Sequence, residues 1–315
     1  RHYFRIGHFG LVVLTFVRFR TGMARGSSRI GRFFDGMAKR LLRFRVFAVP
    51  ARFASNSWLA WSFISRVDRV RTRRKRDRII KAELPKHISI IMDGNRRFAW
   101  SLRLGKKIGH RHGKDKLKEV MDWILDLGIP YLTVYALSTE NLTSRDSDEL
   151  EDLFDLYVSG LNEISEDERI HSSGVKVRVM GRTDDLPERV NEAIRNAQER
   201  TMDYSNFTFT VCIAYGGREE IVDAVKGIAA DYSSGAIGME EINTNEISNR
   251  LYDAQIPDPD LVIRTSGEER ISNFLLWQIA YSELYFTDVH WPSFAKSDLY
   301  DAIETYQMRK RRFGE

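Results

Sequence analysis

The fold is decided by the stretch His87-Ile88-Ser89-Ile90-Ile91-Met92-Asp93-Gly94-Asn95-Arg96-Arg97-Phe98. Its apolar run at 88–92, closed by Asp-Gly, predicts a parallel strand that is buried on both faces. Residues 96–102 predict the first turns of a helix. A strand that ends in a glycine turn and opens into a helix directs free backbone N–H groups, with the positive end of the helix dipole, at one spot.

The polar residues after this strand predict a metal-assisted polyphosphate site. Arg96 and Arg97 supply forked donors that suit phosphate oxygens. Asp93 would repel a bare phosphate, so its position makes sense if a divalent cation lies between the two. From these residues alone, an ordinary Asp-Gly turn with solvated arginines is the alternative.

Charge divides the chain into two regions. The 315 residues carry a net charge of +5, but residues 1–84 contain 21 Lys/Arg and 4 Asp/Glu, whereas the remainder contains 28 and 40. We therefore predict two functional regions, a basic amphipathic N-terminal extension at 1–84 and a separate domain at 85–315. The single cysteine, Cys212, excludes an internal disulfide and fits a reducing compartment. No window reaches the roughly 18 apolar residues that a membrane span needs.

The extension alternates basic with aromatic or aliphatic residues and ends in Arg71-Thr72-Arg73-Arg74-Lys75-Arg76-Asp77-Arg78. A basic amphipathic segment can lie in the interface of an anionic membrane, where each Lys or Arg contributes about 1 kcal/mol. Disorder without a dedicated partner and nucleic-acid contact are the alternatives. We favour association with the membrane surface and expect no nucleic-acid partner.

From residue 85 onward, strand and helix patterns alternate. Strands are predicted at 88–92, 131–137, 175–180, 207–213 and 261–263, and helices at 96–102, 114–128, 148–164, from 187 and from 219. This order predicts an α/β fold, with a mostly parallel central sheet flanked by helices. Ligands bind beyond the C-terminal strand ends of such sheets, and the polar clusters at 93–97, 138–141 and 264–272 all fall there.

A second anion-binding cluster is predicted at 264–278. Arg264, Arg270 and Ser272 surround a turn at Gly267, ahead of a predicted helix. Guanidinium forks and backbone N–H groups in such a turn bind anions. Two separate clusters indicate two phosphorylated substrates, or one long one.

Several long motifs, in this order, resemble the cis-prenyltransferase family, typified by undecaprenyl diphosphate synthase. They are residues 87–110, Ser138-Thr139-Glu140-Asn141, Tyr215-Gly216-Gly217-Arg218, residues 260–291 with Glu283-Leu284-Tyr285-Phe286-Thr287-Asp288, and Arg311-Arg312-Phe313-Gly314. The resemblance covers about 85–315, and the sequence at 138–142 and 257–260 is most similar to that of actinobacterial members.

This resemblance implies a homodimer whose parallel sheet borders an elongated hydrophobic tunnel. Such enzymes condense isopentenyl diphosphate onto an allylic diphosphate, here expected to be geranyl or farnesyl diphosphate, with Mg²⁺ and formation of Z double bonds. Apolar residues of the helix at 150–161 would line the tunnel, with core packing as the alternative.

The resemblance also implies roles for single residues. Asp93 would hold Mg²⁺, and Glu283 would add a metal contact. Asn141, with Ser138 nearby, would assist proton removal, and because a neutral amide is a poor base we expect diphosphate or water to share that work. The expected isopentenyl diphosphate ligands are Arg264, Arg270, Ile271 and Ser272. The other expected substrate-binding residues are Gly94, Asn95, Arg96, Arg97, Phe98, Lys106, His110, Thr139, Glu140, Leu142 and Arg145.

Three residues depart from the family pattern. Lys106 replaces an arginine, Leu142 replaces a bulky aromatic residue and Arg96 replaces a glycine. All three lie in the expected allylic site, which leaves the primer and the product length open. Whether Arg145 or Ser144 occupies the next diphosphate-binding position is also open.

We predict a Mg²⁺-dependent prenyltransferase at the cytoplasmic membrane face that makes a Z-polyprenyl diphosphate, the precursor of a glycosyl carrier lipid. The alternatives are a short-chain Z-prenyl diphosphate synthase, a non-catalytic partner subunit and a membrane-binding scaffold. Non-catalytic subunits of this family typically lose the aspartate of the first motif, and this chain retains it as Asp93.

Overall fold

A computed structural model describes residues 70–313 of the chain. The compact unit to which nearly all of these residues belong spans Thr72–Glu315. Its centre is a six-stranded sheet in the order β3-β4-β2-β1-β5-β6, and all neighbouring strands are parallel. The strands are β1 (His87–Ile91), β2 (Tyr131–Tyr135), β3 (Val175–Met180), β4 (Phe207–Cys212), β5 (Leu261–Arg264) and β6 (Glu283–Phe286). The predicted α/β fold with a mostly parallel sheet is confirmed.

The apolar run at 88–92 explains why β1 lies at the centre. All five residues of the strand are buried, as expected where both faces of a parallel sheet are covered. In the register, Ile91 pairs with Tyr135 on one side and with Arg264 on the other. The segments that follow β1, β2 and β5 therefore leave the sheet at the same edge.

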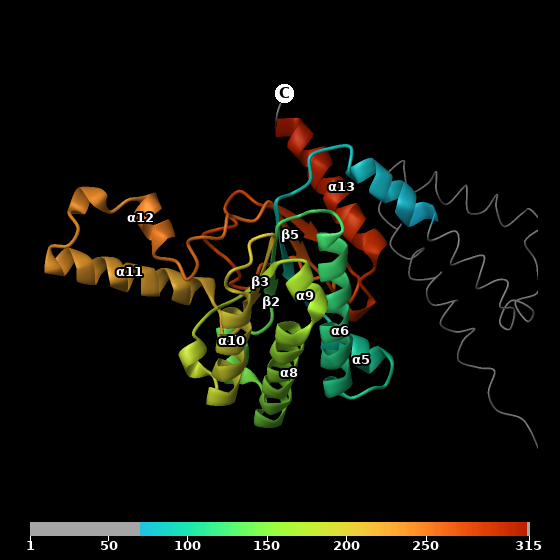
Figure 1. The fold of residues 1–315 in the computed structure, drawn as a ribbon, viewed down its shortest axis with the longest axis horizontal. Helices are drawn as coiled ribbons and strands as arrows, with labels where there is room; N and C mark the ends of the chain where they lie inside the picture. Colours follow the sequence, from blue (N-terminus) through green and yellow to red (C-terminus); the bar gives the residue numbers. More distant parts are fainter. Residues whose placement is uncertain (1–69, 314–315) are drawn as a thin grey trace, which may run out of the picture. The chain divides into compact units, whose positions relative to one another are not determined.

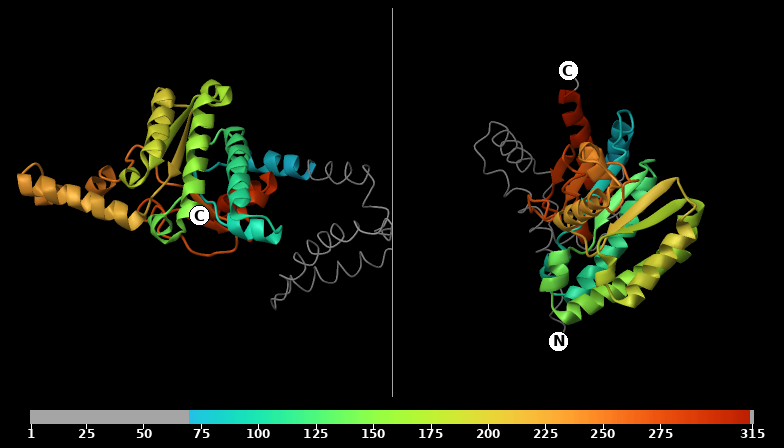
Figure 2. Two further views of the ribbon diagram at one scale, coloured as in Figure 1. Left: turned by 90° about the horizontal axis from the view of Figure 1, so that it is seen from below. Right: turned by 90° about the vertical axis from the view of Figure 1, so that its left-hand side faces the viewer.

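Helices cover both faces of this sheet. One face carries α6, α8 and α10, and α13 lies over the other face, beside β5 and β6 (Figures 1 and 2). Helices α11 and α12 project away from the body (left in Figure 1). The helices named in the text are α5 (Asn95–Ser101), α6 (Lys106–Leu125), α7 (Thr139–Ser144), α8 (Ser147–Glu166), α9 (Glu168–Ser172), α10 (Glu188–Thr201), α11 (Gly217–Ser234), α12 (Thr244–Asn249) and α13 (Lys296–Phe313).

Two element predictions were wrong. Helix α6 begins at Lys106 rather than at 114. The helix expected after the 264–278 cluster is replaced by turns, because Ser272, Asn273 and Leu275 have φ values of 49°, 62° and 46°. Left-handed backbone of this kind does not continue a right-handed helix. The chain then enters β6, a short strand that was not predicted.

The compact unit begins at Thr72 and so includes the last residues of the predicted 1–84 extension. Residues 72–79 are helical and pack on α13. Lys75 Nζ lies 2.6 Å from Asp301 Oδ1, and Gln307 Nε2 donates to the carbonyl of the buried Ile79 at 2.8 Å. The membrane association predicted for the extension falls largely on residues 1–69, outside the described residues. Within 70–313, no helix is both long enough and apolar enough to cross a membrane.

Candidate active site

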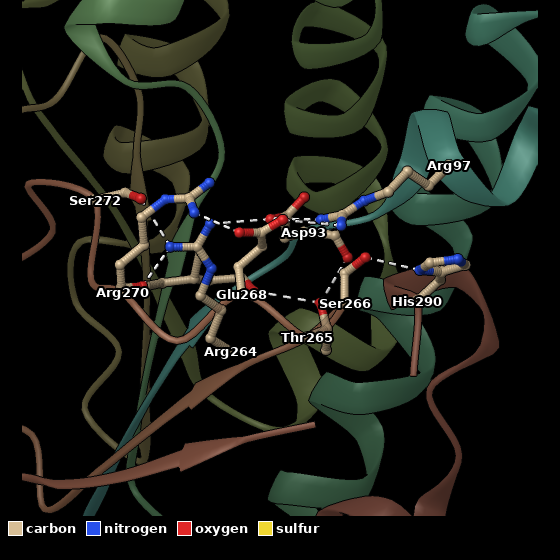
Figure 3. Close-up of polar contacts among 10 residues, drawn as sticks. Asp93, Arg97, Arg264, Thr265, Ser266, Glu268, Arg270, Ser272 and His290 are labelled. Atoms are coloured by element: carbon tan, nitrogen blue, oxygen red, sulfur yellow. Dashed lines mark hydrogen bonds and ion pairs between the residues drawn. The ribbon is translucent and has the colours of Figure 1, made fainter. Parts of the chain in front are cut away.

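Asp93 and Arg264 form the centre of a charged cluster at the carboxyl edge of the sheet (Figure 3). Asp93 follows β1, and Arg264 ends the neighbouring strand β5. The Arg264 side chain is only 5% exposed, and its Nη2 donates to Asp93 Oδ2 at 3.0 Å. Arg97 Nη2 lies 3.1 Å from the same oxygen. Burial works to raise the pKa of Asp93, but the two guanidinium groups hold this pKa below its ordinary value, so the carboxylate is ionised at neutral pH.

The same cluster contains two other predicted isopentenyl diphosphate ligands, Arg270 and Ser272. Arg264 Nη1 donates to Ser272 Oγ at 2.7 Å and to the carbonyl oxygen of Arg270. The carboxylate of Glu268 bridges the side chains of Arg97, at 3.1 Å, and Arg270 (Figure 3). The sequence did not single out Glu268, since in the run Glu268-Glu269-Arg270 nothing separates it from a solvated acid.

Close contact between two turns holds Asp93 beside this cluster. Gly94 has a φ of 104°, and a Cβ built there would lie 2.6 Å from Ser266 Oγ, so only glycine fits. Ser266 Oγ in turn lies 2.7 Å from His290 Nδ1. Thr265 Oγ1 donates to the Asp93 carbonyl oxygen at 2.7 Å. The turn after β1 and the turn after β5 therefore form one unit.

A second cluster gathers around Glu149 of α8. Its carboxylate is 6% exposed, with Arg145 Nη1 2.7 Å from Oε1 and Lys106 Nζ 3.1 Å from Oε2. Arg96 Nη1 and His110 Nε2 lie 3.9 Å and 3.4 Å from Oε1. Burial works to raise the pKa of Glu149, but Lys106, Arg145 and Arg96 hold the pKa below its ordinary value. Four predicted allylic-site residues thus converge on one anion.

Glu149 was not predicted, and its spacing of four residues from Arg145 is not a helical pairing, because Arg145 has extended backbone between α7 and α8. Ser144 is the last residue of α7, and it is Arg145 that contacts this cluster. Burial, followed by the charge of Arg145, lowers the pKa of His110, so its imidazole is neutral at pH 7.

Several polar atoms of the two clusters are buried without a hydrogen-bond partner. Among the described residues these include Nε of Arg145 and of Arg264, Nε2 of His110 and Oδ1 of Asn95. Buried polar atoms in folded proteins are nearly always hydrogen-bonded, so such a concentration at one place is unusual. It is the pattern expected of a site that binds a polar ligand.

Asn95 reaches this position because α5 packs very closely on α6. A Cβ built on Gly109 would lie 2.4 Å from the Asn95 carbonyl oxygen, and one on Gly113 would lie 2.5 Å from Asn95 Oδ1. Side chains at these two positions would push α5 away. The two glycines also explain why the sequence pattern placed the start of α6 too late, since glycine lowers helix propensity.

An apolar cavity of about 830 Å³, including its open mouth, extends from this region between α6, α8 and the sheet. Asn95 and His110 line it beside the clusters. Deeper lining residues are mostly apolar and include Leu117, Met121, Leu153, Leu156, Tyr157, Leu161, Ile164, Val211 and Ile213. This cavity is the predicted hydrophobic tunnel, and residues of α8 line it as expected.

Ser138 and Asn141 lie at the start of α7. Ser138 Oγ accepts a hydrogen bond from the Asn141 backbone N–H at 3.1 Å, so Ser138 is the N-cap of the helix. Glu140 Oε1 accepts from Asn273 Nδ2 at 3.0 Å, and the Thr139 N–H donates to the Tyr215 carbonyl oxygen at 3.1 Å. The Glu140–Asn273 contact ties α7 to the segment that carries Ser272, and the Thr139–Tyr215 bond ties it to the segment after β4. The catalytic role of Asn141 stays a prediction.

The remaining predicted ligands contribute packing. Phe98 contacts the ring of His112 edge to face, with 5.8 Å between centroids. Leu142 and Ile271 are partly buried and pack against the hydrophobic core. None of these contacts tests their predicted roles in substrate binding.

Glu283 is not brought to Asp93 in this chain. It pairs with Leu261 at the amino end of its strand, whereas Asp93 lies beyond the carboxyl end of β1. Leu261, the partner of Glu283, precedes Arg264 by three residues in β5, which corresponds to about 10 Å along the strand. Its carboxylate instead accepts from Arg309 Nη1 at 2.9 Å. Within one chain, Glu283 and Asp93 therefore do not share a cation.

Comparison with protein families identifies the family to which a chain with this site belongs. A sequence model of prenyltransferases, described as undecaprenyl diphosphate synthase, matches residues 91–314. The chain belongs to this cis-prenyltransferase family. The predicted family is confirmed.

Relatives and solved structures agree with this assignment. The tritrans,polycis-undecaprenyl-diphosphate synthase (geranylgeranyl-diphosphate specific) of Methanopyrus kandleri is 51% identical over 238 residues, covering 76% of this chain and 88% of the relative. The enzyme of the same name from Picrophilus torridus is 48% identical, covering 79% and 97%. Lavandulyl diphosphate synthase from Lavandula x intermedia, in complex with dimethylallyl diphosphate, superimposes with a TM-score of 0.70 at 35% identity, covering 74% and 99%. A probable undecaprenyl diphosphate synthase from Campylobacter jejuni gives 0.60 at 30% identity, with the same coverage.

The protein is therefore a prenyltransferase of the cis type, which condenses isopentenyl diphosphate with an allylic diphosphate. The finer likeness to actinobacterial members stays a prediction.

Proposed function

We propose that this cis-prenyltransferase extends geranylgeranyl diphosphate with isopentenyl diphosphate to a Z-polyprenyl diphosphate of about undecaprenyl length. The observation that carries the proposal is the placement of two basic clusters on either side of the turn at 93–97, with an apolar cavity leading away from one of them. The relatives' names specify geranylgeranyl diphosphate, which replaces the shorter geranyl and farnesyl diphosphates expected from the sequence.

The cluster around Glu149 is proposed to hold the allylic diphosphate, whose prenyl chain then lies in the cavity. Arg96, Lys106, His110 and Arg145 supply the donors, and the unpartnered Nε of Arg145 supports this role. The cluster around Arg264 is proposed to hold the diphosphate of isopentenyl diphosphate. This arrangement gives each substrate its own anion site and places the reacting carbons between the two sites.

Asp93 fits the role of a magnesium ligand. Mg²⁺ usually binds through one or two carboxylates together with substrate phosphates, so a single ionised carboxylate between two diphosphate sites is sufficient. Both guanidinium contacts of Asp93 in the described part of the chain fall on Oδ2, which leaves Oδ1 for the cation. A bound Mg²⁺ ion would neutralise negative charge on the departing diphosphate. Glu283 does not join this ligand set from the same chain.

The chain's own residues are proposed to do the rest. Arg96, Lys106 and Arg145 stabilise the leaving diphosphate through charge-assisted hydrogen bonds. The neutral imidazole of His110 donates one further hydrogen bond. Asn141 orients the proton acceptor during formation of the new double bond, and the acceptor itself is a diphosphate oxygen or water.

We further propose that two copies form a homodimer. Helix α11 projects from the body and carries Val222, Val225 and Tyr232, each about half exposed and all on one face of the helix. Apolar residues on a projecting helix are typical of an interface. The net charge of +17 in residues 1–84 supports our proposal of association with the cytoplasmic face of an anionic membrane.

A primer-competition assay tests this function. The full chain is incubated with labelled isopentenyl diphosphate, Mg²⁺ and geranyl, farnesyl or geranylgeranyl diphosphate, and the products are sized. We expect the highest kcat/KM with geranylgeranyl diphosphate and a product near undecaprenyl length. A preference for a shorter primer contradicts the proposed substrate, and products of only a few isoprene units support the short-chain alternative. Absence of any product contradicts the proposed elongation reaction. The proposed homodimer is tested separately, by measuring the molar mass of the full chain with light scattering.

A further inference from the structure

Two lysines interrupt the apolar lining of the cavity. Lys114 and Lys118 of α6 line it together with leucine, isoleucine and methionine side chains. Neither lysine contacts either of the two substrate clusters in the described structure. Their side chains are only 17% and 34% exposed, so the apolar stems form part of the wall while the ammonium groups reach its edge.

Both ammonium groups bind one carboxylate on the facing helix. Lys114 Nζ lies 2.6 Å from Glu163 Oε1, and Lys118 Nζ forms an ion pair with Glu163 Oε2. Lys114 Nζ also donates to Ser159 Oγ at 3.4 Å. The Lys114–Glu163–Lys118 cluster therefore links α6 to α8 along one side of the cavity.

Gly160 explains how the stem of Lys114 fits against α8. A Cβ built on Gly160 would lie 3.5 Å from Lys114 Cδ, an ordinary van der Waals contact. The stem thus covers a place where α8 presents no side chain. A larger residue at this position would fill the cavity, since Gly160 lines it too.

The size of the cavity makes this link relevant to elongation. The 830 Å³ includes open solvent at the mouth, and the space that the centre of a water-sized sphere can occupy is only about 120 Å³, less than the roughly 300–1,000 Å³ of a typical ligand pocket. A polyprenyl chain of undecaprenyl length does not fit in this space as it stands. The growing chain must therefore separate α6 from α8, or pass between them, and the ion pairs oppose that movement.

We propose that the Lys114–Glu163–Lys118 cluster is a determinant of product length, because it resists the separation of α6 and α8 that longer chains require. The proposal rests on the elongation reaction proposed above. It predicts opposite effects for two changes at the same wall. Loss of the ion pairs lengthens the product, and filling of the space over Gly160 shortens it.

The test measures product length for three variants of the full chain. Glu163→Gln keeps the shape of the side chain and removes its charge, and we expect the main product to grow by at least one isoprene unit. Gly160→Leu should shorten it by at least one unit. The matched control is Asp152→Asn, since the Lys107–Asp152 ion pair joins the same two helices at 2.5 Å but does not line the cavity. This control should leave product length unchanged.

The thermal unfolding midpoint of each variant separates length control from general stability. An unchanged product length in active Glu163→Gln overturns the proposal, as does an equal lengthening in Asp152→Asn. If the wild-type enzyme is active and the variants make products of unchanged length, only this inference is contradicted. A wild-type enzyme that makes no polyprenyl product contradicts the elongation reaction, and the inference with it.

Discussion

The two anion clusters differ in how their bridging carboxylates are held. Glu149 lies on the long helix α8, and its carboxylate is 6% exposed. Glu268 lies on a turn whose preceding residues, Ser266 and Gly267, have φ values of 78° and 76°, and its carboxylate is 30% exposed. Both carboxylates join basic side chains that we assign to diphosphate binding. Only Glu149 is fixed in place by a helix and by burial.

This difference indicates two ways of preparing a basic site. Around Glu149, the cations are held in position by a permanent counter-ion, so the allylic site is organised before substrate binds. Around Glu268, the carboxylate can swing towards solvent when a diphosphate replaces it. Asp93 contacts Arg264 and Arg97 of one cluster, and Arg96 of the same turn reaches Glu149 of the other, so this turn connects the two clusters.

The largest effect is expected at Asp93. Asp93→Asn keeps the size of the side chain but removes the charge that would bind a cation, and we expect kcat to fall by about 10²–10³-fold or more. The asparagine can still accept a hydrogen bond from Arg264, which limits the loss of stability. Circular dichroism of the variant should match that of the wild type. Turnover close to that of the wild type would contradict the role proposed for Asp93 as a magnesium ligand.

A smaller effect, confined to one cluster, is expected at Arg270. Loss of a charge-assisted hydrogen bond to a diphosphate costs about 1.5–3 kcal/mol, so Arg270→Ala should raise the KM for isopentenyl diphosphate about 10-fold to 100-fold. The KM for the allylic substrate should stay within about twofold, because Arg270 does not contact the Glu149 cluster. Initial rates with each substrate varied in turn provide the measurement. Equal changes in both constants would show that the clusters are not separate sites.

The two bridging carboxylates should differ in their contribution to stability. Glu149→Gln leaves buried basic groups without their counter-ion, and we expect the free energy of unfolding to fall by about 1–3 kcal/mol. Glu268→Gln, the matched variant on the turn, should cost less, since solvent screens its ion pairs. Denaturant titrations of the two variants provide the comparison. Equal losses would contradict the distinction between a fixed and a movable carboxylate.

The contribution of Glu149 should also depend on pH. Its pKa in the folded protein lies below the ordinary value of 4.5. The stabilisation is therefore complete above that pH and is lost as the pH falls through the lower folded-state value. The stability difference between the wild type and Glu149→Gln should shrink in acid, and a constant difference would indicate a different cause.

The smallest effect is expected at Ser138, at the edge of the site. Loss of an N-cap costs about 1 kcal/mol, so Ser138→Ala should lower stability by about that amount. Ser138→Asn retains a capping side chain and should restore stability. If the serine hydroxyl takes part in catalysis, Ser138→Asn will have low activity despite its restored stability. Equal activity of Ser138→Asn and the wild type would show that Ser138 acts only as the N-cap of α7.

Local patterns in the sequence were enough to predict most of the sheet. The runs that became β1, β3 and β4 are apolar or alternating, and their burial depends on neighbours of the same kind. Strand β6 was missed because Glu283–Phe286 is a four-residue strand whose side chains are only partly buried. Its pairing with β5 depends on contacts between segments distant in sequence.

Local patterns in the sequence also predicted part of the candidate site. Asp93, Arg264, Arg270 and Ser272 follow strand ends, and the carboxyl edge of a parallel sheet brings such residues together. Glu149 lies within a helix, and its four basic neighbours come from three separate segments of the chain. No local pattern shows that convergence. The left-handed backbone at Leu275 and its neighbours could not be predicted from the sequence either, because leucine rarely adopts this conformation.

The packing of α5 on Gly109 and Gly113 limits how this enzyme can change during evolution. Asn95 lies against both glycines, and the cavity begins at the same place. A mutation that widened or narrowed the cavity mouth here would displace the turn that carries Asp93, and turnover would fall together with any gain in selectivity. New product lengths are therefore more accessible through substitutions farther along α6 and α8, away from the chemistry.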